Sequence, residues 1–162
     1  DNESIKCTLD DLIYRYGEVL LNYAEAKAEL DECDQSVLDQ TVNKLRDRVG
    51  MPHLTVSVGF LDPNWPDWEV PVSSLLNEIR RERRVELACE GLRWNDLCRW
   101  KAGKLLENEK TYLGARDPET GEYYVIYPNM KRLWYDRLYL YPIPTDEFIY
   151  NPNLLPQNPG WE

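Results

Sequence analysis

Apolar residues recur at helical spacing in two stretches near the start of the chain. In residues 11–30 the recurring positions are Leu12, Tyr16, Val19, Leu20, Tyr23 and Ala24. In residues 36–49 they are Leu38, Val42, Leu45 and Val49. This spacing predicts two helices, the first capped by Asp10 or Asp11, the second capped by Ser36 and ended by Gly50. Together they predict a helical hairpin of about the size of a tetratricopeptide unit.

Two more helices are predicted further along the chain, over residues 72–90 and 93–106. The apolar stripe of the third helix begins with Val72, Leu75, Leu76 and Ile79, and its continuation is charged. Acids recur every four residues along this helix, at Glu78, Glu82, Glu86 and Glu90. Like charges at that spacing repel one another, so groups outside the row must compensate them.

Arginines of the same helix and of its neighbours can provide this compensation through bidentate pairs with the carboxylates. We therefore expect a structural ion-pair network, with no catalytic residue and no metal ligand. Its predicted members are Arg46, Arg48, Glu82, Arg83, Glu86, Glu90, Arg93, Asp96 and Arg99. Two alternatives stay open. Two of the four glutamates can form a glycoside hydrolase pair, or the acids can form a helical metal site, although the sequence has no Glu-x-x-His motif.

The helical period stops at Glu107. Residues 117–121 carry a turn signal, and residues 123–127 after them predict a short hairpin strand. Residues 144–147 predict one helical turn. The Pro- and Asn-rich tail, residues 151–161, contains Leu and Trp, so we expect it to pack on the body of the protein. A chain of 162 residues is long enough for one domain with its own core.

The composition narrows the classes of ligand. A formal charge of −10 argues against nucleic acid and against an anionic membrane surface as partner. No apolar run is long enough to span a bilayer. The sequence contains six Trp and eleven Tyr but only two Phe, so most of its aromatic side chains carry a polar atom. Such rings suit interfaces and sugar platforms, and they also fill cores.

Two aromatic clusters are the candidate ligand contacts, because sugar binding requires exposed aromatic faces beside polar groups. The first cluster lies in a proline-stiffened loop and consists of Asn64, Trp65, Asp67 and Trp68. The second lies in the irregular region and consists of Tyr112, Tyr123, Tyr124, Trp134 and Tyr135. The alternative for both clusters is packing of the loops onto the helices or onto a missing N-terminal part.

Cysteine and histidine do not form a recognisable site. The four cysteines are Cys7, Cys33, Cys89 and Cys98. The sequence has no CxxC pair and a single histidine, His53, which excludes a Cys/His zinc site of standard spacing. We expect buried free thiols and no cofactor.

Five segments carry motifs in a fixed order. They are residues 15–26 (RYGEVLLNYAEA), 43–50 (NKLRDRVG), 79–100, 140–144 (LYPIP) and 157–161 (QNPGW). The third, IRRERRVELACEGLRWNDLCRW, is similar to the pattern I-x-x-E-R-x-x-E-L-x-x-E-G-x-R-W-x-D-L-x-R-W. Together they resemble the C-terminal part of the SusD/RagB family, surface lipoproteins of Bacteroidetes that capture nutrients for a TonB-dependent transporter. Trp161 stands where tyrosine is common in that family.

The resemblance implies an all-α fold of tetratricopeptide-like helical hairpins with long irregular loops and a packed, largely non-regular C-terminal segment. It implies a single domain over residues 1–162, within a longer lipoprotein whose signal peptide and lipid-anchored cysteine lie outside this chain.

The function that the resemblance implies is non-enzymatic. It is binding of a glycan, or in some members a peptide, at the outer-membrane surface and delivery to a SusC-like TonB-dependent transporter. The family's matched motifs are chiefly structural, so they assign no ligand contact. A protein-binding helical repeat and a glycoside hydrolase remain the alternatives.

Overall fold

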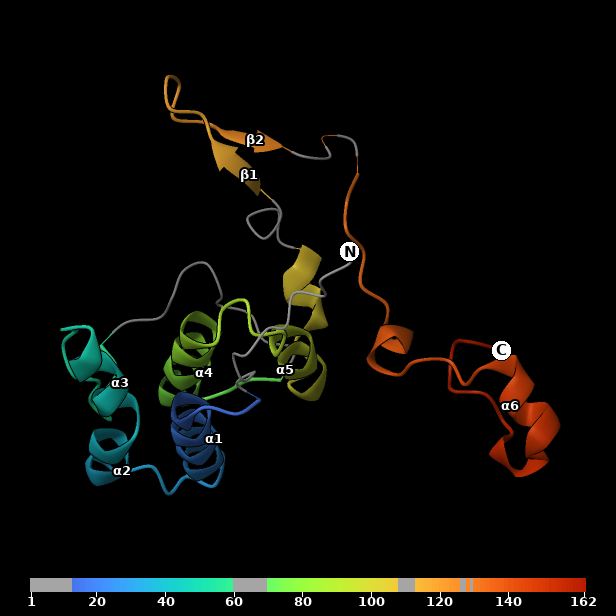
Figure 1. Cartoon of the computed structure of the whole chain (residues 1–162), viewed down its shortest axis with the longest axis horizontal. Helices are drawn as coiled ribbons and strands as arrows, with labels where there is room; N and C mark the ends of the chain where they lie inside the picture. The colour runs from blue at the N-terminus through green and yellow to red at the C-terminus, as the bar shows by residue number, and fades with distance from the viewer. Residues whose placement is uncertain (1–12, 60–69, 108–112, 126–127, 129) are drawn as a thin grey trace, which may run out of the picture. The chain divides into compact units, whose positions relative to one another are not determined.

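The computed structural model describes residues 13–59, 70–107, 113–125, 128 and 130–162 (Figure 1). The chain divides into two compact units. Unit 1 comprises Asp1–Leu61 and Ser73–Glu90, and unit 2 comprises Asp62–Val72 and Gly91–Glu162. The single domain expected over residues 1–162 stays a prediction.

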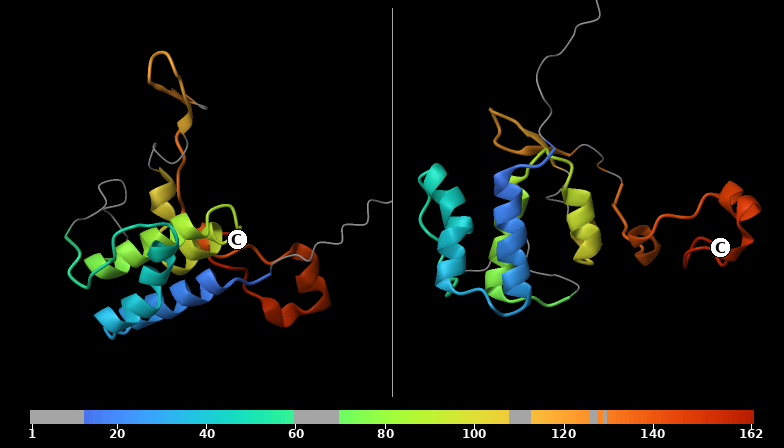
Figure 2. Two further views of the ribbon diagram at one scale, coloured as in Figure 1. Left: turned by 60° about the vertical axis from the view of Figure 1, so that its left-hand side comes forward. Right: turned by 60° about the horizontal axis from the view of Figure 1, so that its bottom comes forward.

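Unit 1 is a small helical assembly of α1 (Tyr16–Glu29), α2 (Gln35–Gln40), α3 (Val42–Arg48) and α4 (Ser74–Glu86). Helix α1 contacts each of the other three, and both views of Figure 2 show these helices side by side. The core consists of apolar side chains that these helices turn toward one another: Leu20, Leu21, Ala24, Ala28, Leu38, Val42, Leu45, Leu76 and Ile79.

The apolar residues of α1 divide between two faces. Leu20 and Ala24 are buried, whereas Tyr16, Val19 and Tyr23 are about half exposed or more. The helix begins at Tyr16 rather than near residue 11, because the backbone of Arg15 is extended. The predicted caps Asp10 and Asp11, like Leu12, lie outside the described residues. The single apolar face expected for this helix was therefore wrong in part.

The helix predicted over residues 36–49 is two helices separated by Thr41. The backbone of Thr41 leaves the helical region at φ −125° and ψ −94°, and its hydroxyl donates to the Val37 carbonyl oxygen at 2.6 Å. Asp34, not Ser36, caps the pair by accepting from the Val37 amide at 2.8 Å. Gly50 ends α3 as predicted, with φ +68°.

Helix α4 is shorter than the predicted span of residues 72–90. Ser73 caps it by accepting from the Leu76 amide at 3.1 Å. It ends at Glu86 because Cys89 and Gly91 both adopt left-handed backbone conformations, at φ +67° and +76°, which no helix continues through. Cys89 is exposed, so the expectation of buried thiols was wrong for this cysteine.

Unit 2 begins with α5 (Arg93–Arg99) and the 3-10 helix η1 (Gly103–Glu107). These replace the single helix predicted over residues 93–106, because Lys101 between them has φ +49°. A small core of Leu97, Trp100, Ala102 and Leu105 forms where they meet. The other elements among the described residues of this unit are β1 (Leu113–Arg116), β2 (Tyr123–Val125), η3 (Asp136–Tyr139), α6 (Thr145–Tyr150) and η4 (Pro152–Leu154).

The predicted hairpin strand is present as β2, which pairs antiparallel with β1 in the register Leu113↔Val125 and Arg116↔Tyr123. The turn signal at residues 117–121 makes the connection, and the Gly121 amide donates to the Asp117 carbonyl oxygen at 2.9 Å. Helix α6 lies where one helical turn was predicted.

The tail contacts residues 137–143 of its own unit through polar groups. Gln157 exchanges two hydrogen bonds of 2.8 Å with the backbone of Ile143. The Trp161 indole N–H donates to the carbonyl oxygens of Arg137 and Leu140, at 3.0 and 2.9 Å. Leu155 is exposed, so tryptophan and glutamine rather than leucine anchor the tail. None of the helices that the structure describes is long and apolar enough to cross a bilayer.

Candidate functional site

The row of acids runs along α4 to Glu86 and ends beyond the helix at Glu90, and it meets arginines from α3. Arg46 donates to both Glu78 and Glu82, at 2.8 and 2.7 Å, and to the Pro52 carbonyl oxygen at 3.2 Å. The side chains of Arg46, Glu78 and Glu82 are only 8%, 4% and 12% exposed. Arg81 adds a second partner for Glu78 at 2.6 Å. Buried carboxylates at helical spacing are thus compensated by cations that lie between them.

The C-terminal end of the row is paired in the same way. Arg15 contacts Glu86 at 2.6 Å and Glu90 at 2.7 Å, and it also donates to the Glu86 carbonyl oxygen. Arg48 contacts Glu86 at 2.8 Å from a largely exposed position. The hydrogen bonds with Glu90 and Glu86 raise the pKa of Arg15, and the hydrogen bond from Arg15 lowers the pKa of Glu90.

Two further arginines join α4 to α1. Arg80 and Arg83 approach the buried carboxylate of Glu25, at 3.7 and 4.0 Å. Arg80 also pairs with Glu29 at 3.1 Å, and Arg83 donates to the Asn22 side-chain oxygen at 2.7 Å. Glu25 and Glu29 were not among the predicted members, although their positions every four residues on the first predicted helix gave the signal.

The remaining predicted members lie in unit 2. Arg99 pairs with Asp96 at 3.0 Å, one turn away on α5. The guanidinium carbons of Arg93 and Arg99 lie 5.7 and 4.7 Å from the Trp100 ring centroid. The structure therefore brings Arg46, Arg48, Glu82, Arg83, Glu86 and Glu90 together in unit 1, and Arg93, Asp96 and Arg99 in unit 2.

All four acids of the row have arginine partners. An acid–base pair for glycoside hydrolysis needs one carboxyl group free to give a proton and one free to meet the sugar or a water. Glu78, Glu82 and Glu86 are largely buried and paired, and Glu90 is paired with Arg15. This arrangement argues against the hydrolase alternative. Among the described residues, no group of three or more His, Cys, Asp or Glu side chains is placed to hold a metal ion.

The aromatic candidates are only partly described. Asn64, Trp65, Asp67, Trp68 and Tyr112 lie outside the described residues, so their role stays a prediction.

The described aromatic candidates lie on different elements. Tyr123 and Tyr124 are exposed on β2, and the Tyr124 hydroxyl donates to Asp117 at 2.8 Å. Backbone hydrogen bonding from Thr120 and this tyrosine contact lower the pKa of Asp117. Tyr135 is exposed beside Arg137, whose guanidinium carbon is 5.6 Å from the ring centroid.

Trp134 is buried within an aromatic stack. Its ring centroid lies 5.6 Å from that of Trp94 and 4.9 Å from that of Tyr139. Its amide donates to the Glu107 carboxylate at 2.7 Å, and its ring lies against Gly103, where a Cβ would overlap the indole. Trp134 therefore supports neighbouring side chains rather than presenting a free face.

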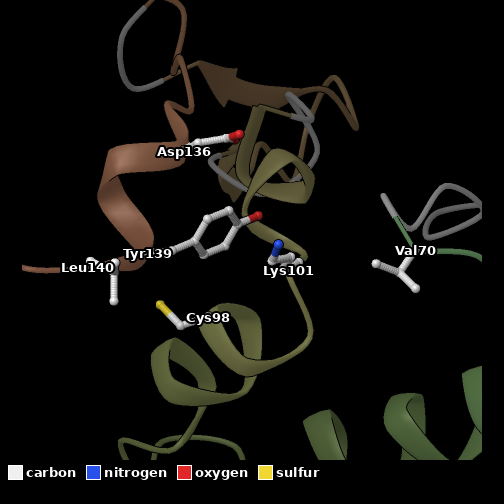
Figure 3. Close-up of a pocket in the computed structure, with 6 residues that line it drawn as sticks. All are labelled: Val70, Cys98, Lys101, Asp136, Tyr139 and Leu140. Atoms are coloured by element: carbon white, nitrogen blue, oxygen red, sulfur yellow. The ribbon is translucent and has the colours of Figure 1, made fainter. Parts of the chain in front are cut away.

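A pocket of about 630 Å³ opens beside this stack (Figure 3). All six lining residues belong to unit 2: Val70, Cys98, Lys101, Asp136, Tyr139 and Leu140. Figure 3 shows the Tyr139 hydroxyl directed toward Lys101. Sequence reasoning missed this site because its residues come from three separated segments.

Comparison with known proteins shows the family of this chain. The model of the SusD family matches residues 1–161. The chain belongs to the SusD family. It is 35% identical over 152 residues to SusD-like protein P2 of Formosa agariphila. The aligned region covers 91% of this chain and 25% of that protein.

A solved SusD-like protein supports the same assignment. The crystal structure of a SusD-like protein from Bacteroides fragilis matches with 36% identity and a TM-score of 0.65, over 91% of this chain and 25% of that one. The chain therefore spans about a quarter of the length of these SusD-family relatives. The predicted all-α fold class with irregular loops is confirmed, since the structure is mostly helical with irregular segments and matches a SusD-like structure.

Most residues of the SusD-family motifs form structural contacts, and few of them line the pocket. Residues 15–26, 43–50 and 79–90 supply most of the charged side chains that pair in unit 1, although Glu29 and Glu78 lie outside them. Residues 157–161 anchor the tail. Of the pocket residues, only Cys98 and Leu140 lie within the motifs, whereas Lys101, Asp136 and Tyr139 do not.

Proposed function

We propose that this chain is part of a protein that binds nutrient glycans at the outer-membrane surface, in polysaccharide utilisation. The protein delivers them to a SusC-like TonB-dependent transporter. The observation that carries the proposal is the match of the SusD family model to residues 1–161. An oligosaccharide is the proposed ligand, and a peptide is the alternative ligand.

The proposed mechanism is capture and transfer, without making or breaking a bond. The pairing of Glu78, Glu82, Glu86 and Glu90 with arginines supports it, because these acids are the ones that a hydrolase would use. No cofactor takes part in this mechanism.

The proposed location is the outer membrane, as a surface-exposed lipoprotein. The proposed attachment to the membrane is through a lipid anchor. A net charge of −10 supports this, because it disfavours direct adsorption on anionic lipid and also disfavours nucleic acid as a partner.

The proposed ligand contacts are the two aromatic clusters predicted from the sequence. Their polar-tipped rings suit stacking against sugars. Trp134 is buried and packs against Tyr139, so its proposed role is to hold Tyr139 in place. The exposed Tyr123, Tyr124 and Tyr135 are the proposed direct contacts with the sugar.

The test is a glycan array on the wild-type chain and on a Trp65→Ala/Trp68→Ala double variant. We expect one glycan class to be retained, with retention lost or weakened at least tenfold in the double variant, because stacking contributes about 1 kcal/mol or more per ring. Tyr150→Ala is the matched control, since Tyr150 is exposed and belongs to neither cluster. An array on which nothing is retained contradicts the proposal.

A protein-binding helical repeat is the second candidate function. The observation that favours it is the exposed apolar stripe of α1, formed by Tyr16, Val19 and Tyr23. Retention of a defined soluble protein that is lost in Tyr16→Lys/Tyr23→Lys, with no glycan retained, would favour this candidate over glycan binding.

A further inference from the structure

The pocket of unit 2 has a size and a composition that suit a small polar ligand. Its volume of about 630 Å³ lies within the range of small-ligand sites. It combines an aromatic ring, a cation, a carboxylate and apolar side chains, from Tyr139, Lys101, Asp136, Val70 and Leu140.

Tyr139 is held rigidly in the wall of this pocket. Its hydroxyl oxygen accepts from the Gly103 amide at 2.9 Å, and its ring packs on Trp134 at 4.9 Å between centroids. Trp134 is itself buried against Trp94. A ring fixed in this way offers a flat apolar surface for the C–H face of a pyranose, and little freedom is lost when the ligand binds.

Lys101 occupies a backbone position that favours glycine. It follows α5 at φ +49°, with the Lys101 and Ala102 amides donating to the Cys98 and Leu97 carbonyl oxygens at 3.1 and 2.8 Å. Gly50 fills the same position after α3, at φ +68°. Strained residues of this kind concentrate at functional sites. A cation near a helix C-terminus also interacts favourably with the helix dipole, so the test must separate the two roles.

The charges that line the pocket oppose one another. The Lys101 ammonium can donate hydrogen bonds and the Asp136 carboxylate can accept them, so a ligand with a net charge of either sign meets one repelling group. A neutral polyol meets none, because each of its hydroxyls both donates and accepts. We infer that this pocket binds one neutral pyranose ring, stacked on Tyr139 and hydrogen-bonded to Lys101 and Asp136. The inference rests on the proposed glycan-binding function and names the site and the charge class of the sugar.

Cys98 provides a direct readout of occupancy, because it lines the pocket and is half-buried. The exposed Cys89 of unit 1 is an internal control in the same chain. Burial raises the pKa of the Cys98 thiol, so alkylation by N-ethylmaleimide is best followed at alkaline pH, by mass spectrometry of the two peptides. With a neutral hexasaccharide from the array bound at saturation, alkylation of Cys98 should slow several-fold while that of Cys89 is unchanged.

A glycine variant tests the role of the lysine without straining the backbone. Lys101→Gly removes the amine and relieves the left-handed conformation, so the variant should fold at least as well as the wild type. Loss of a charge-assisted hydrogen bond should raise the Kd for that hexasaccharide about tenfold. Asp31→Gly is the matched control, because Asp31 holds the same left-handed position after α1 at φ +56°. It should leave the Kd unchanged.

The outcomes separate this inference from the proposed function. Retention of a neutral glycan with protected Cys98 and a weakened Lys101→Gly variant supports both. Retention with unprotected Cys98, or with unchanged affinity in Lys101→Gly, overturns the assignment of this pocket and leaves glycan binding standing. Retention of oligogalacturonate alone overturns the neutral class. Retention of no glycan overturns both.

Discussion

Arg46 donates hydrogen bonds to two carboxylates of α4 and to the carbonyl oxygen of Pro52. Arg48, two residues later, pairs with Glu86 from a side chain that is 56% exposed. Removing one partner of a buried pair leaves an uncompensated charge, whereas water replaces the partner of an exposed one. The two arginines therefore differ in importance although both form ion pairs of similar length.

Substituting Arg46→Met should lower the free energy of unfolding by about 3–5 kcal/mol, because it leaves Glu78 and Glu82 without their shared cation. Arg48→Met should change it by less than about 1 kcal/mol. Urea unfolding followed by circular dichroism measures both. Equal effects of the two substitutions would show that burial does not govern this network.

The pairing of Arg15 with Glu90 predicts a defined dependence of stability on pH. The hydrogen bond from Arg15 lowers the pKa of Glu90 below its ordinary value of 4.5. The stabilisation is therefore present above pH 4.5 and is lost as the pH falls through the lower, folded-state pKa. Arg15 stays charged throughout because the same contacts raise its pKa.

Glu90→Gln should accordingly lower the Tm at neutral pH, and the difference from wild type should vanish in acid. Thermal melts across this range give the comparison. Glu119→Gln, in the exposed hairpin turn, is the control and should match wild type at every pH. A Tm difference that persists in acid would assign the effect of Glu90 to packing rather than to charge.

At the scale of elements, the structure has helices in all four stretches where the apolar spacing predicted one. Two of these four predicted helices are each divided into two shorter helices. Thr41 carries no glycine or proline signal, and its break depends on a hydroxyl that donates to the backbone one turn earlier. Lys101 likewise ends α5 without a glycine. The sequence could not predict that Asp34 rather than Ser36 caps α2, because the side chains of both residue types can accept a hydrogen bond from a backbone amide.

The ion pairs of α4 could be anticipated because acids at a spacing of four require cations. The pocket could not, because no local pattern shows that Asp136 and Tyr139 return to the end of α5. The strand β1 was missed for a similar reason, since Leu113–Arg116 is short, contains glycine and is defined only by its partner β2.

The close approach of η1 to Trp134 predicts a strong effect of a single methyl group. Gly103→Ala should lower the free energy of unfolding by about 1–3 kcal/mol, because the new Cβ overlaps the indole ring and displaces it. Near-ultraviolet circular dichroism should report the displaced tryptophan. Gly59→Ala is the control, because a Cβ there meets open space. An unchanged spectrum and stability for Gly103→Ala would contradict this packing.

At the scale of the whole molecule, the proposal of one domain predicts that the two units unfold together. All six tryptophans lie in unit 2, at positions 65, 68, 94, 100, 134 and 161, whereas the Arg46 pairs lie in unit 1. Tryptophan fluorescence therefore follows unit 2 alone. Arg46→Met should shift the fluorescence transition by as much as the circular dichroism transition. A fluorescence transition that does not move would show two independent domains.

Membership of the SusD family connects these scales. The motifs that identify the family contribute chiefly buried charge pairs and tail anchors, while the residues that line the pocket lie mostly between the motifs. The chain spans about a quarter of the length of the relatives that it matches.

Binding of an intact glycan is the central claim, and affinity electrophoresis followed by mass spectrometry of the recovered glycan tests it most directly. We predict that the chain is retarded by one class of polysaccharide and that the bound oligosaccharide is recovered with unchanged mass after prolonged incubation. Shortened products that disappear in Glu78→Gln or Glu86→Gln would contradict the account by making the α4 acids catalytic. Migration unaffected by every polysaccharide would contradict glycan binding itself.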